Sequence, residues 1–252
     1  MILELNGVSF GYEGCDTISD IGFSAGPGDL VAVLGPNGVG KTTMIKCINR
    51  IHAVRSGAVD VDGRDVLREP IREVARMVGY VPQKAHLSGT TVFDSVVIGR
   101  KPHMGMSLSE YDIRLTGRVI EMMGLSKISD KPVNEISGGE YQLVQIARAV
   151  VQRPRVILLD EPTSNLDLGN QHMVMRTISG IVKANGICAV MTCHDVNLAL
   201  RYCDRFVMMK EGAIDCAGGR EVVNADSIRR VYGVDVDMGT VSGFPVVIPK
   251  EV

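Results

Sequence analysis

Uninterrupted apolar runs alternate with amphipathic stretches along most of this chain. Leu30–Leu34 and Val156–Leu159 contain only apolar residues, which is typical of strands buried on both faces of a sheet. From Thr42 to Ile51, apolar residues recur on one face of a predicted helix. Further strands are predicted at 78–83, 187–193 and 206–209, and further helices near 170–184 and at 195–202. This alternation predicts an α/β fold with a mainly parallel sheet covered on both faces.

Three segments interrupt the alternation. Residues 1–30 suggest short strands and turns, with strands at Ile2–Leu5 and Val8–Phe10 and a turn at Gly11–Gly14. Residues 87–150 contain no convincing strand, so we predict a helical insertion there. The end of the chain suggests a helix near 220–232 and an extended segment at 245–249. We therefore predict one domain, 1–252, and its parts are a core at 1–86 and 151–215, an insertion at 87–150 and a tail at 216–252.

A glycine-rich loop follows the first buried strand directly. The run from Gly35 to Thr42 has the pattern Gly-x4-Gly-Lys-Thr, between a strand and a helix. Glycines let successive N–H groups point at phosphates, and the helix start adds its positive dipole end. The alternative is a plain turn between strand and helix, which this pattern in this context disfavours. We expect the loop to bind ATP, and its predicted contacts are Gly35, Pro36, Asn37, Gly38, Val39, Gly40, Lys41, Thr42 and Thr43.

Two acidic residues follow the buried strand 156–159. Asp160 is predicted at the carboxyl edge of the sheet, where ligands bind in open α/β folds. There it would hold Mg²⁺ together with the Thr42 hydroxyl. Glu161 is placed to accept a proton from an attacking water. The alternative is an Asp-Glu cap before Pro162, which becomes improbable beside a phosphate loop.

A second glycine motif precedes the last helix of the insertion. Ser137, Gly138, Gly139 and Glu140 could form an anion site at a helix N-terminus. The alternative, a capping box made by Ser137 and Glu140, is compatible with that role. One nucleotide does not need two such sites from one chain. The motif therefore predicts a head-to-tail homodimer that holds two ATP molecules between its subunits.

Together these motifs resemble the ATP-binding cassette family over almost the whole chain. Ile136–Glu140 is similar to that family's signature, usually Leu-Ser-Gly-Gly-Gln, with conservative changes at both ends. The resemblance implies that Tyr12 stacks on adenine, although an ordinary turn tyrosine is the alternative. It also implies that Gln83 contacts Mg²⁺ or water and that His194 reaches the γ-phosphate. Asp167 matches a loop that crosses the dimer interface.

The resemblance also implies an architecture and a set of roles. The fold would be a RecA-like P-loop NTPase core with an N-terminal antiparallel β lobe and an inserted helical subdomain. The implied catalytic residues are Lys41, Gln83, Glu161 and His194. The implied Mg²⁺ ligands are Thr42, Gln83 and Asp160.

Some segments resemble one group within the family. Val96–His103 and Val231–Val236 are similar to importers of iron–siderophores, haem and cobalamin. This implies an ATPase subunit on the cytoplasmic face of the membrane, working with two permease subunits and, indirectly, a substrate-binding protein. Gly99–His103 would be a docking surface for the permease. An exporter subunit and a soluble ABC ATPase remain the alternatives. The interval from Lys41 to Ser137, 137 − 41 = 96 residues, is too short for the long coiled coil of a DNA-repair ATPase.

Composition adds few constraints. The net charge of −2 and pI near 6.2, without Trp, give no reason to expect nucleic acid as a partner. No apolar run reaches the ~18 residues of a membrane span, so another chain is expected to cross the membrane. The six cysteines have no Cys-x-x-Cys spacing and are expected to be small packing residues.

Overall fold

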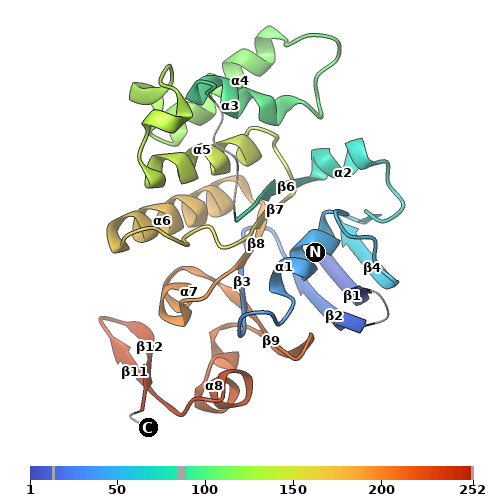
Figure 1. The fold of residues 1–252 in the computed structure, drawn as a ribbon, viewed down its shortest axis with the longest axis vertical. Coiled ribbons are helices and arrows are strands. Elements are labelled where there is room, and N and C mark those ends of the chain that lie inside the picture. The colour runs from blue at the N-terminus through green and yellow to red at the C-terminus, as the bar shows by residue number, and fades with distance from the viewer. Residues whose placement is uncertain (13–14, 84–88, 251–252) are drawn as a thin grey trace.

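The computed structural model describes residues 1–12, 15–83 and 89–250, and a six-stranded sheet lies at its centre (Figure 1). Across the sheet the strands are β10 (Ala213–Gly218), β9 (Arg205–Lys210), β3 (Leu30–Leu34), β8 (Cys188–Thr192), β7 (Val156–Leu159) and β6 (Val78–Val81). Neighbouring strands pair in parallel except β10, which runs antiparallel to β9. The predicted mainly parallel sheet is confirmed.

Both faces of this sheet are buried. Every residue of β3, β7 and β8 is buried, as their uninterrupted apolar sequences predict. Alternate residues of β3 enter two separate cores: Ala32 and Leu34 join one, and Val31 and Val33 the other. The helices that cover the faces are α1 (Lys41–Ile48), α5 (Gly138–Val150), α6 (Leu168–Asn185) and α7 (Val196–Tyr202). Helix α1 ends at Ile48, earlier than the end predicted at Ile51. Arg50, just beyond it, has a left-handed backbone with φ of 58°.

A four-stranded antiparallel sheet packs on the far side of α1 (Figure 1). Its strands, in order, are β2 (Cys15–Ala25), β1 (Leu3–Tyr12), β4 (Ser56–Val61) and β5 (Arg64–Asp65). The two short strands predicted before residue 12 are one strand, whose register shifts against β2. Strand β2 has no clear sequence signal, because Asp20, with φ of 51°, interrupts the alternation of buried and exposed positions. Glu13 and Gly14 of the predicted turn lie outside the described residues.

The predicted helical insertion forms the end of the molecule drawn at the top of Figure 1. Among residues 89–150 the structure has helices and turns, with one isolated β-bridge between Thr91 and Pro132. The helices here are α3 (Val92–Val97), η1 (Ile98–Arg100), α4 (Glu110–Met122), η2 (Ser126–Ile128), η3 (Val133–Glu135) and α5. Helix α2 (Ile71–Met77) precedes the insertion and connects directly to β6. Because α5 packs on both α3 and α6, it connects the insertion to the core.

The C-terminal segment lies at the opposite end of the molecule (Figure 1). Residues 220–222 form the short η4, and the predicted helix follows as α8 (Ala225–Tyr232). The predicted extended segment is β12 (Phe244–Pro249), which pairs with β11 (Val236–Val241) in a hairpin. Strand β11 was not predicted, because its outer residues are polar or exposed. The predicted boundary at residue 215 falls inside β10, so β10 belongs with the core sheet.

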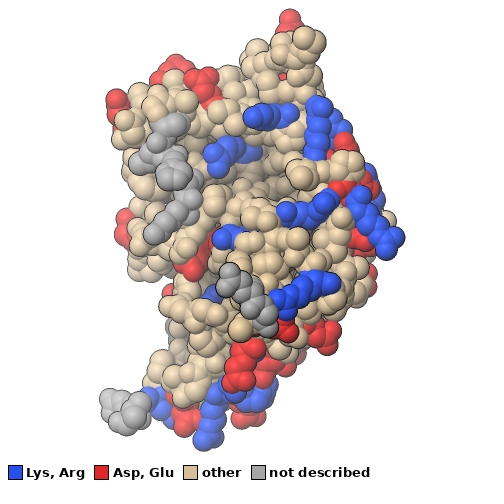
Figure 2. Space-filling model, turned by 45° about the vertical axis from the view of Figure 1, so that its right-hand side comes forward, with Lys and Arg blue, Asp and Glu red and all other residues tan. Residues whose placement is uncertain are grey.

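The charged surface, the helices and the cysteines can each be compared with what the composition predicted. Figure 2 shows one face on which Lys and Arg side chains gather over the middle and the upper right, while many Asp and Glu side chains lie along the left edge and toward the bottom. Within the described parts of the chain, no helix combines the length and the apolar character needed to cross a membrane. Four cysteines, Cys47, Cys188, Cys193 and Cys203, are buried free thiols, whereas Cys15 is exposed and Cys216 intermediate.

Candidate active site

The glycine-rich loop connects β3 to α1 in a tightly folded path. A Cβ atom at Gly35 would lie 2.5 Å from the Met209 carbonyl oxygen, and Gly40 has φ of 101°. Side chains are therefore excluded at both ends of the loop. The Lys41 Nζ atom donates to the carbonyl oxygens of Gly35 (2.7 Å) and Pro36 (2.8 Å). The loop and its lysine form a compact unit with a cation held over the backbone.

Lys41 is buried, with only 6% of its surface exposed. Burial lowers the pKa of its ammonium group, while the nearby Glu161 and Asp160 carboxylates act in the opposite direction. Among the described residues, the partners within hydrogen-bonding distance of this buried cation are carbonyl oxygens, so a phosphate group would supply a negative charge there. The lysine is therefore prepared for an anionic ligand.

Asp160 is brought against the phosphate loop by β7. Its Oδ1 atom accepts hydrogen bonds from the hydroxyls of Thr42 (2.8 Å) and Thr192 (2.9 Å), and the residue is 2% exposed. The sequence predicts the meeting of Thr42 and Asp160, and the structure places them together. Thr192, at the end of β8, was not predicted. Its only sequence signal is its position two residues before His194, at the end of a strand on the same sheet edge.

Glu161 is fixed at three points. Its backbone, with φ of 48°, donates through N–H to the Thr192 hydroxyl at 2.7 Å. Its Oε1 atom lies 2.5 Å from Nε2 of His194, and its Oε2 atom accepts a hydrogen bond of 2.5 Å from Nε2 of Gln83. A left-handed backbone at a non-glycine residue is uncommon and is stabilised by its surroundings. Three predicted site residues from separate segments thus meet at one carboxylate.

A hollow of about 160 Å³ opens over the phosphate loop. Its lining includes Lys41, Thr42, Thr43 and Glu161 together with Thr17 of β2, which was not predicted. The rest of the lining is Asn37, Gly38 and Gly40. Hydroxyls, the glycine-rich backbone and the Lys41 cation surround the hollow together with the Glu161 carboxylate, so a phosphate chain beside a proton acceptor fits its chemistry.

The same edge suits a hard divalent cation. The Thr42 hydroxyl and the Asp160 carboxylate are hydrogen-bonded to each other, so two oxygen ligands already converge. The Gln83 side chain reaches the adjacent Glu161 carboxylate. Oxygen ligands of this kind are those that Mg²⁺ takes, usually one or two carboxylates with waters and substrate phosphates. The donor set therefore fits Mg²⁺.

The second glycine motif lies at the N-terminus of α5 as a capping box. The Ser137 hydroxyl accepts from the Glu140 N–H (3.3 Å), and the Glu140 carboxylate accepts from the Ser137 N–H (2.8 Å) and hydroxyl (2.7 Å). The capping alternative is therefore confirmed. Hydrogen bonds from the Ser137 side chain and backbone lower the pKa of Glu140. Among the described residues that line the phosphate hollow, none comes from 137–140.

Helix α5, which begins at the second glycine motif, contacts the start of α6. A Cβ atom at Gly139 would lie 2.4 Å from Oδ1 of Asn170, so only glycine leaves room for that side chain. Asp167 caps α6 by accepting from the Asn170 N–H at 2.8 Å, and Asn170 Nδ2 donates to the Asp167 carboxylate at 2.7 Å. Asn170 was not predicted. It joins the segment that carries Asp167 to the second glycine motif within one chain.

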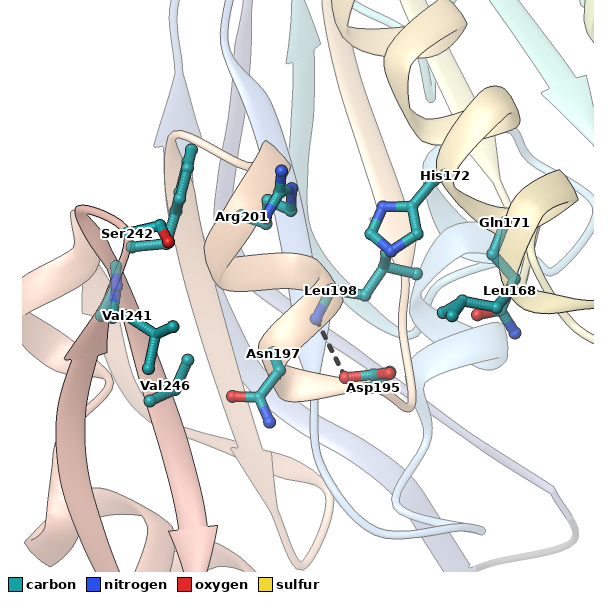
Figure 3. A pocket seen from close by; sticks show the side chains of 12 residues that line it. Leu168, Gln171, His172, Asp195, Asn197, Leu198, Arg201, Val241, Ser242 and Val246 are labelled. Atoms are coloured by element: carbon teal, nitrogen blue, oxygen red, sulfur yellow. Dashed lines mark hydrogen bonds between the residues drawn. The ribbon is translucent and has the colours of Figure 1, made fainter.

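A larger hollow, of about 310 Å³, lies away from these groups (Figure 3). It is bordered by α6, α7 and the β11–β12 hairpin. Asn197, which follows the α7 cap Asp195, donates to the Val247 carbonyl (3.1 Å) and accepts from the Val247 N–H (2.7 Å). The phosphate hollow is smaller but is lined by Lys41, Thr42 and Glu161, so we place the chemistry there. The hairpin is instead tied to the helix that begins just after His194.

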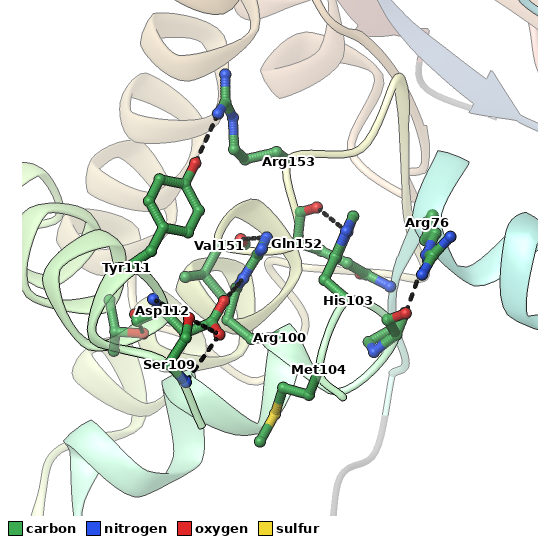
Figure 4. Close-up of polar contacts among 12 residues, drawn as sticks. Arg76, Arg100, His103, Met104, Ser109, Tyr111, Asp112, Val151, Gln152 and Arg153 are labelled. Atoms are coloured by element: carbon green, nitrogen blue, oxygen red, sulfur yellow. Dashed lines mark hydrogen bonds and ion pairs between the residues drawn. The ribbon is translucent and has the colours of Figure 1, made fainter. Parts of the chain in front are cut away.

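The segment 99–103 faces inward more than its sequence suggested (Figure 4). Arg100 is buried and pairs with Asp112 (2.7 Å), and it also donates to the Val151 carbonyl (3.0 Å). The His103 ring lies 2.9 Å from the Gln152 carbonyl oxygen. Of residues 99–103, only Lys101 is exposed. The two residues that make this segment distinctive therefore anchor the insertion to α5 and to the residues just after it.

Comparison with known proteins gives the same family throughout. The family model described as ABC transporter matches residues 18–164, more than half of the chain. An uncharacterised ABC transporter ATP-binding protein of Methanocaldococcus jannaschii is 47% identical over 249 residues, covering 99% of this chain and 98% of that protein. Both matches agree with the family on which the predicted fold was based.

Two relatives are named for an imported cargo, and one solved structure matches almost the whole chain. The phosphonates import ATP-binding protein of Alcaligenes faecalis is 32% identical over 245 residues (93% of this chain, 89% of that protein). The hemin import ATP-binding protein of Myxococcus xanthus is 31% identical over 262 residues (99% and 97%). An ABC transporter described as metal-chelate type, in an inward-facing conformation, superimposes with a TM-score of 0.87 at 24% identity (99% and 97%). That structural likeness shows the fold.

Proposed function

This chain belongs to the ABC transporter family of ATP-binding proteins, and on that premise we propose that it is the ATP-hydrolysing subunit of an importer. The single observation that carries the hydrolytic role is the meeting of Gln83, Glu161 and His194 beside the phosphate loop. These residues come from three segments of the chain. Their convergence on one carboxylate supports a site that handles a water molecule next to a triphosphate.

The residues divide the work of hydrolysis between them. Lys41 and the loop N–H groups hold the phosphates of ATP. Glu161 accepts a proton from the attacking water, whose oxygen bonds to the γ-phosphorus while the bond to the bridging oxygen breaks and ADP leaves. His194 and Gln83 orient the Glu161 carboxylate, because each already contacts one of its oxygens. Mg²⁺, held by Thr42, Asp160 and Gln83, would supply charge neutralisation of the phosphates.

A second copy of the chain completes each site in this proposal. Ser137–Glu140 forms a helix start without a phosphate hollow of its own among the described residues. Ser137 is exposed, and Glu140, whose carboxylate accepts from the Ser137 hydroxyl, is half-buried. In a head-to-tail homodimer this motif, with Asp167 nearby, would close over the γ-phosphate bound by the partner. Two ATP molecules would then lie between two chains.

Permease subunits would dock on the side where the insertion meets the core. A hollow of about 220 Å³ there is lined by Tyr80, Ile98, Pro102 and Gln152, among others. Ile98, Met106 and Ile71 are large apolar residues that are exposed in this chain. The exposed Ile98 at this hollow suits contact with an apolar helix of a membrane partner. We therefore propose that the residues around this hollow, rather than the Arg100 and His103 side chains, form the docking surface, and that the subunit lies at the cytoplasmic face of the membrane.

The cargo proposed is an iron–siderophore, haem or cobalamin. The resemblance of Val96–His103 and the likeness to a hemin import protein support this class. A phosphonate is the competing cargo, because a phosphonates import protein is similar to the same extent. Cargo in such a system is chosen by the binding protein and the permease, so the ATPase itself carries only this indirect support.

Three measurements test the proposal in order. The purified chain should release phosphate from ATP in a Mg²⁺-dependent manner, and Lys41→Ala should abolish that release. An affinity-tagged chain extracted in detergent should carry its permease subunits with it. Cells lacking the gene should lose uptake of one radiolabelled cargo among ferric siderophore, haemin, cobalamin and phosphonate. Recovery of an exporter-type partner, or of no membrane partner, would overturn the importer assignment. The proposed ATP-hydrolysing role would still stand.

A further inference from the structure

Tyr12, although more than half exposed, is not a free tyrosine. Its hydroxyl lies 3.0 Å from Nε2 of His52, and its ring packs at 87° against Phe10, with 4.9 Å between ring centroids. The ring of His52 stacks on Phe10 at 4.7 Å with 10° between the planes. The three rings form a cluster at the end of β1 with one large ring surface, that of Tyr12, open to solvent.

His52 itself is held by the helix of the phosphate loop. Its backbone N–H donates to the Lys46 carbonyl oxygen of α1 at 3.0 Å. Helix α1 begins at Lys41, so the residue that binds phosphate and the Lys46 carbonyl that holds the His52 backbone belong to one short helix. Phe10, which supports the other side of the imidazole, is buried. The His52 ring is therefore constrained on its backbone, its face and its Nε2 atom.

The imidazole is suited to a neutral contact of this kind. Burial and, after it, the charge of Lys46 lower the pKa of His52, so the ring is neutral near pH 7. A neutral imidazole can either donate to or accept from the Tyr12 hydroxyl, depending on its tautomer. In both cases the tyrosine ring cannot rotate freely about its side-chain torsions.

We propose that His52 is a positioning residue for nucleotide binding: it fixes the ring of Tyr12 at the orientation in which the base stacks on it. This inference rests on the proposed function, in which Tyr12 contacts adenine. The physical reason is preorganisation. A side chain that is already ordered before the ligand arrives does not lose its rotamer freedom on binding. The spacing between base and phosphates is also set, because α1 carries both Lys41 and the contact that holds His52.

The size of the effect follows from that reason. Ordering one side chain on binding weakens affinity by about three- to tenfold. Loss of the His52 contact should therefore raise the KM for ATP by about that factor and leave kcat within about twofold, because the groups around Glu161 are untouched. Inhibition by inorganic tripolyphosphate, which has no base, should not change.

The experiment uses five variants of the full chain. His52→Phe keeps the stacking on Phe10 but cannot bond to the Tyr12 hydroxyl, and Tyr12→Phe removes the hydroxyl but keeps the ring. Each should raise the KM for ATP by about three- to tenfold, and the double variant should be no worse than either single variant. His52→Gln, which can still reach the hydroxyl with its amide, should recover part of the loss. Tyr12→Leu removes the ring altogether.

The outcomes separate the two levels of the proposal. An unchanged KM in His52→Phe, or additive losses in the double variant, would overturn the positioning role. So would a weaker inhibition by tripolyphosphate in His52→Phe, since that would show a general disturbance of α1. If Tyr12→Leu retains the wild-type KM for ATP, then the base does not stack on Tyr12, and the stacking assignment fails together with this inference while hydrolysis by Glu161 stands.

Discussion

Oε1 of Glu161 lies 2.5 Å from Nε2 of His194, although 33 positions along the chain separate the two residues. The second carboxylate oxygen is taken by Gln83. In this arrangement both oxygens of the proposed proton acceptor are already engaged by side chains. Each carboxylate oxygen can accept a further hydrogen bond, so a water molecule can still reach Glu161 while these two partners orient it.

Replacing Glu161 by Gln tests the proton acceptor. We expect Glu161→Gln to bind ATP but to hydrolyse it at least about 100-fold more slowly, because an amide does not accept the proton of water. Because the bound ATP then remains intact between the two chains, the dimer should persist in size-exclusion chromatography. Glu121→Gln, an exposed change on α4, is the matched control and should behave as wild type. Hydrolysis near the wild-type rate would remove Glu161 from this role, and an ATP-bound monomer would contradict the dimer.

A mixture of two inactive variants tests whether sites are shared between copies. Lys41→Ala disables the phosphate loop and Ser137→Arg blocks the second glycine motif, so each should be inactive alone. In a random mixture half of the dimers are mixed, and each mixed dimer has one intact site, so activity should recover to about a quarter of wild type. Native mass spectrometry would show that mixed dimers form. Their presence without any phosphate release would contradict the sharing of sites.

Thr192 is predicted to position the acidic pair. Its hydroxyl donates to Asp160 and accepts from the backbone N–H of Glu161, so it holds both residues in register. Thr192→Val keeps the shape but loses both bonds, and kcat should fall by about ten- to a hundredfold with little change in KM. Thr192→Ser restores the hydroxyl and should restore most of kcat. Equal rates for the Val and Ser variants would exclude this role.

The buried pair of Arg100 and Asp112 should be important for stability. Arg100→Ala leaves Asp112 buried without its cation, which is expected to cost about 3–5 kcal/mol of unfolding free energy. Arg114→Ala removes an exposed pair with Glu110 on the same helix and should cost only about 0.5 kcal/mol or less. Urea denaturation of both variants measures the difference. Similar losses in the two would mean that burial does not set the strength of this pair.

Lowering the pH should weaken the contact between Arg100 and Asp112 and thereby lower the free energy of unfolding. Hydrogen bonds from the Ser109 hydroxyl and then from Arg100 lower the pKa of Asp112 below its usual value. A carboxyl whose pKa is lower when folded stabilises the protein above its unfolded pKa, near 3.9, and loses that contribution as pH falls through the folded value. We therefore expect unfolding free energy to decrease as pH falls below about 4.

Asp112→Asn is the variant that tests this sign. Its stability should fall less steeply in that acid range than that of wild type, in urea titrations at pH 7, 4 and 3. Asp130→Asn, an exposed aspartate of the same insertion, should keep the wild-type slope. A steeper slope for Asp112→Asn would reverse the assignment.

Much of the site follows from local sequence. The strand–loop–helix at 30–48 and the acidic end of β7 are each encoded within a few residues, because their backbone and burial patterns are local properties. Their meeting was predictable as well, since the carboxyl ends of parallel strands share one edge. The capping box of Ser137 and Glu140 was also readable, because its two partners are three residues apart.

Contacts between distant segments were decided by tertiary structure. Thr192, Asn170 and His52 have no motif of their own, and each gains its role from a partner brought close by the fold. The segment 99–103 shows the reverse case, since its Arg100 and His103 look like surface groups in the sequence but pack inward against Asp112 and Gln152. The physical reason is the same for both. Sequence fixes which backbone shapes and buried faces are favourable, whereas the position of a polar side chain depends on which partner the packed core leaves within hydrogen-bonding distance.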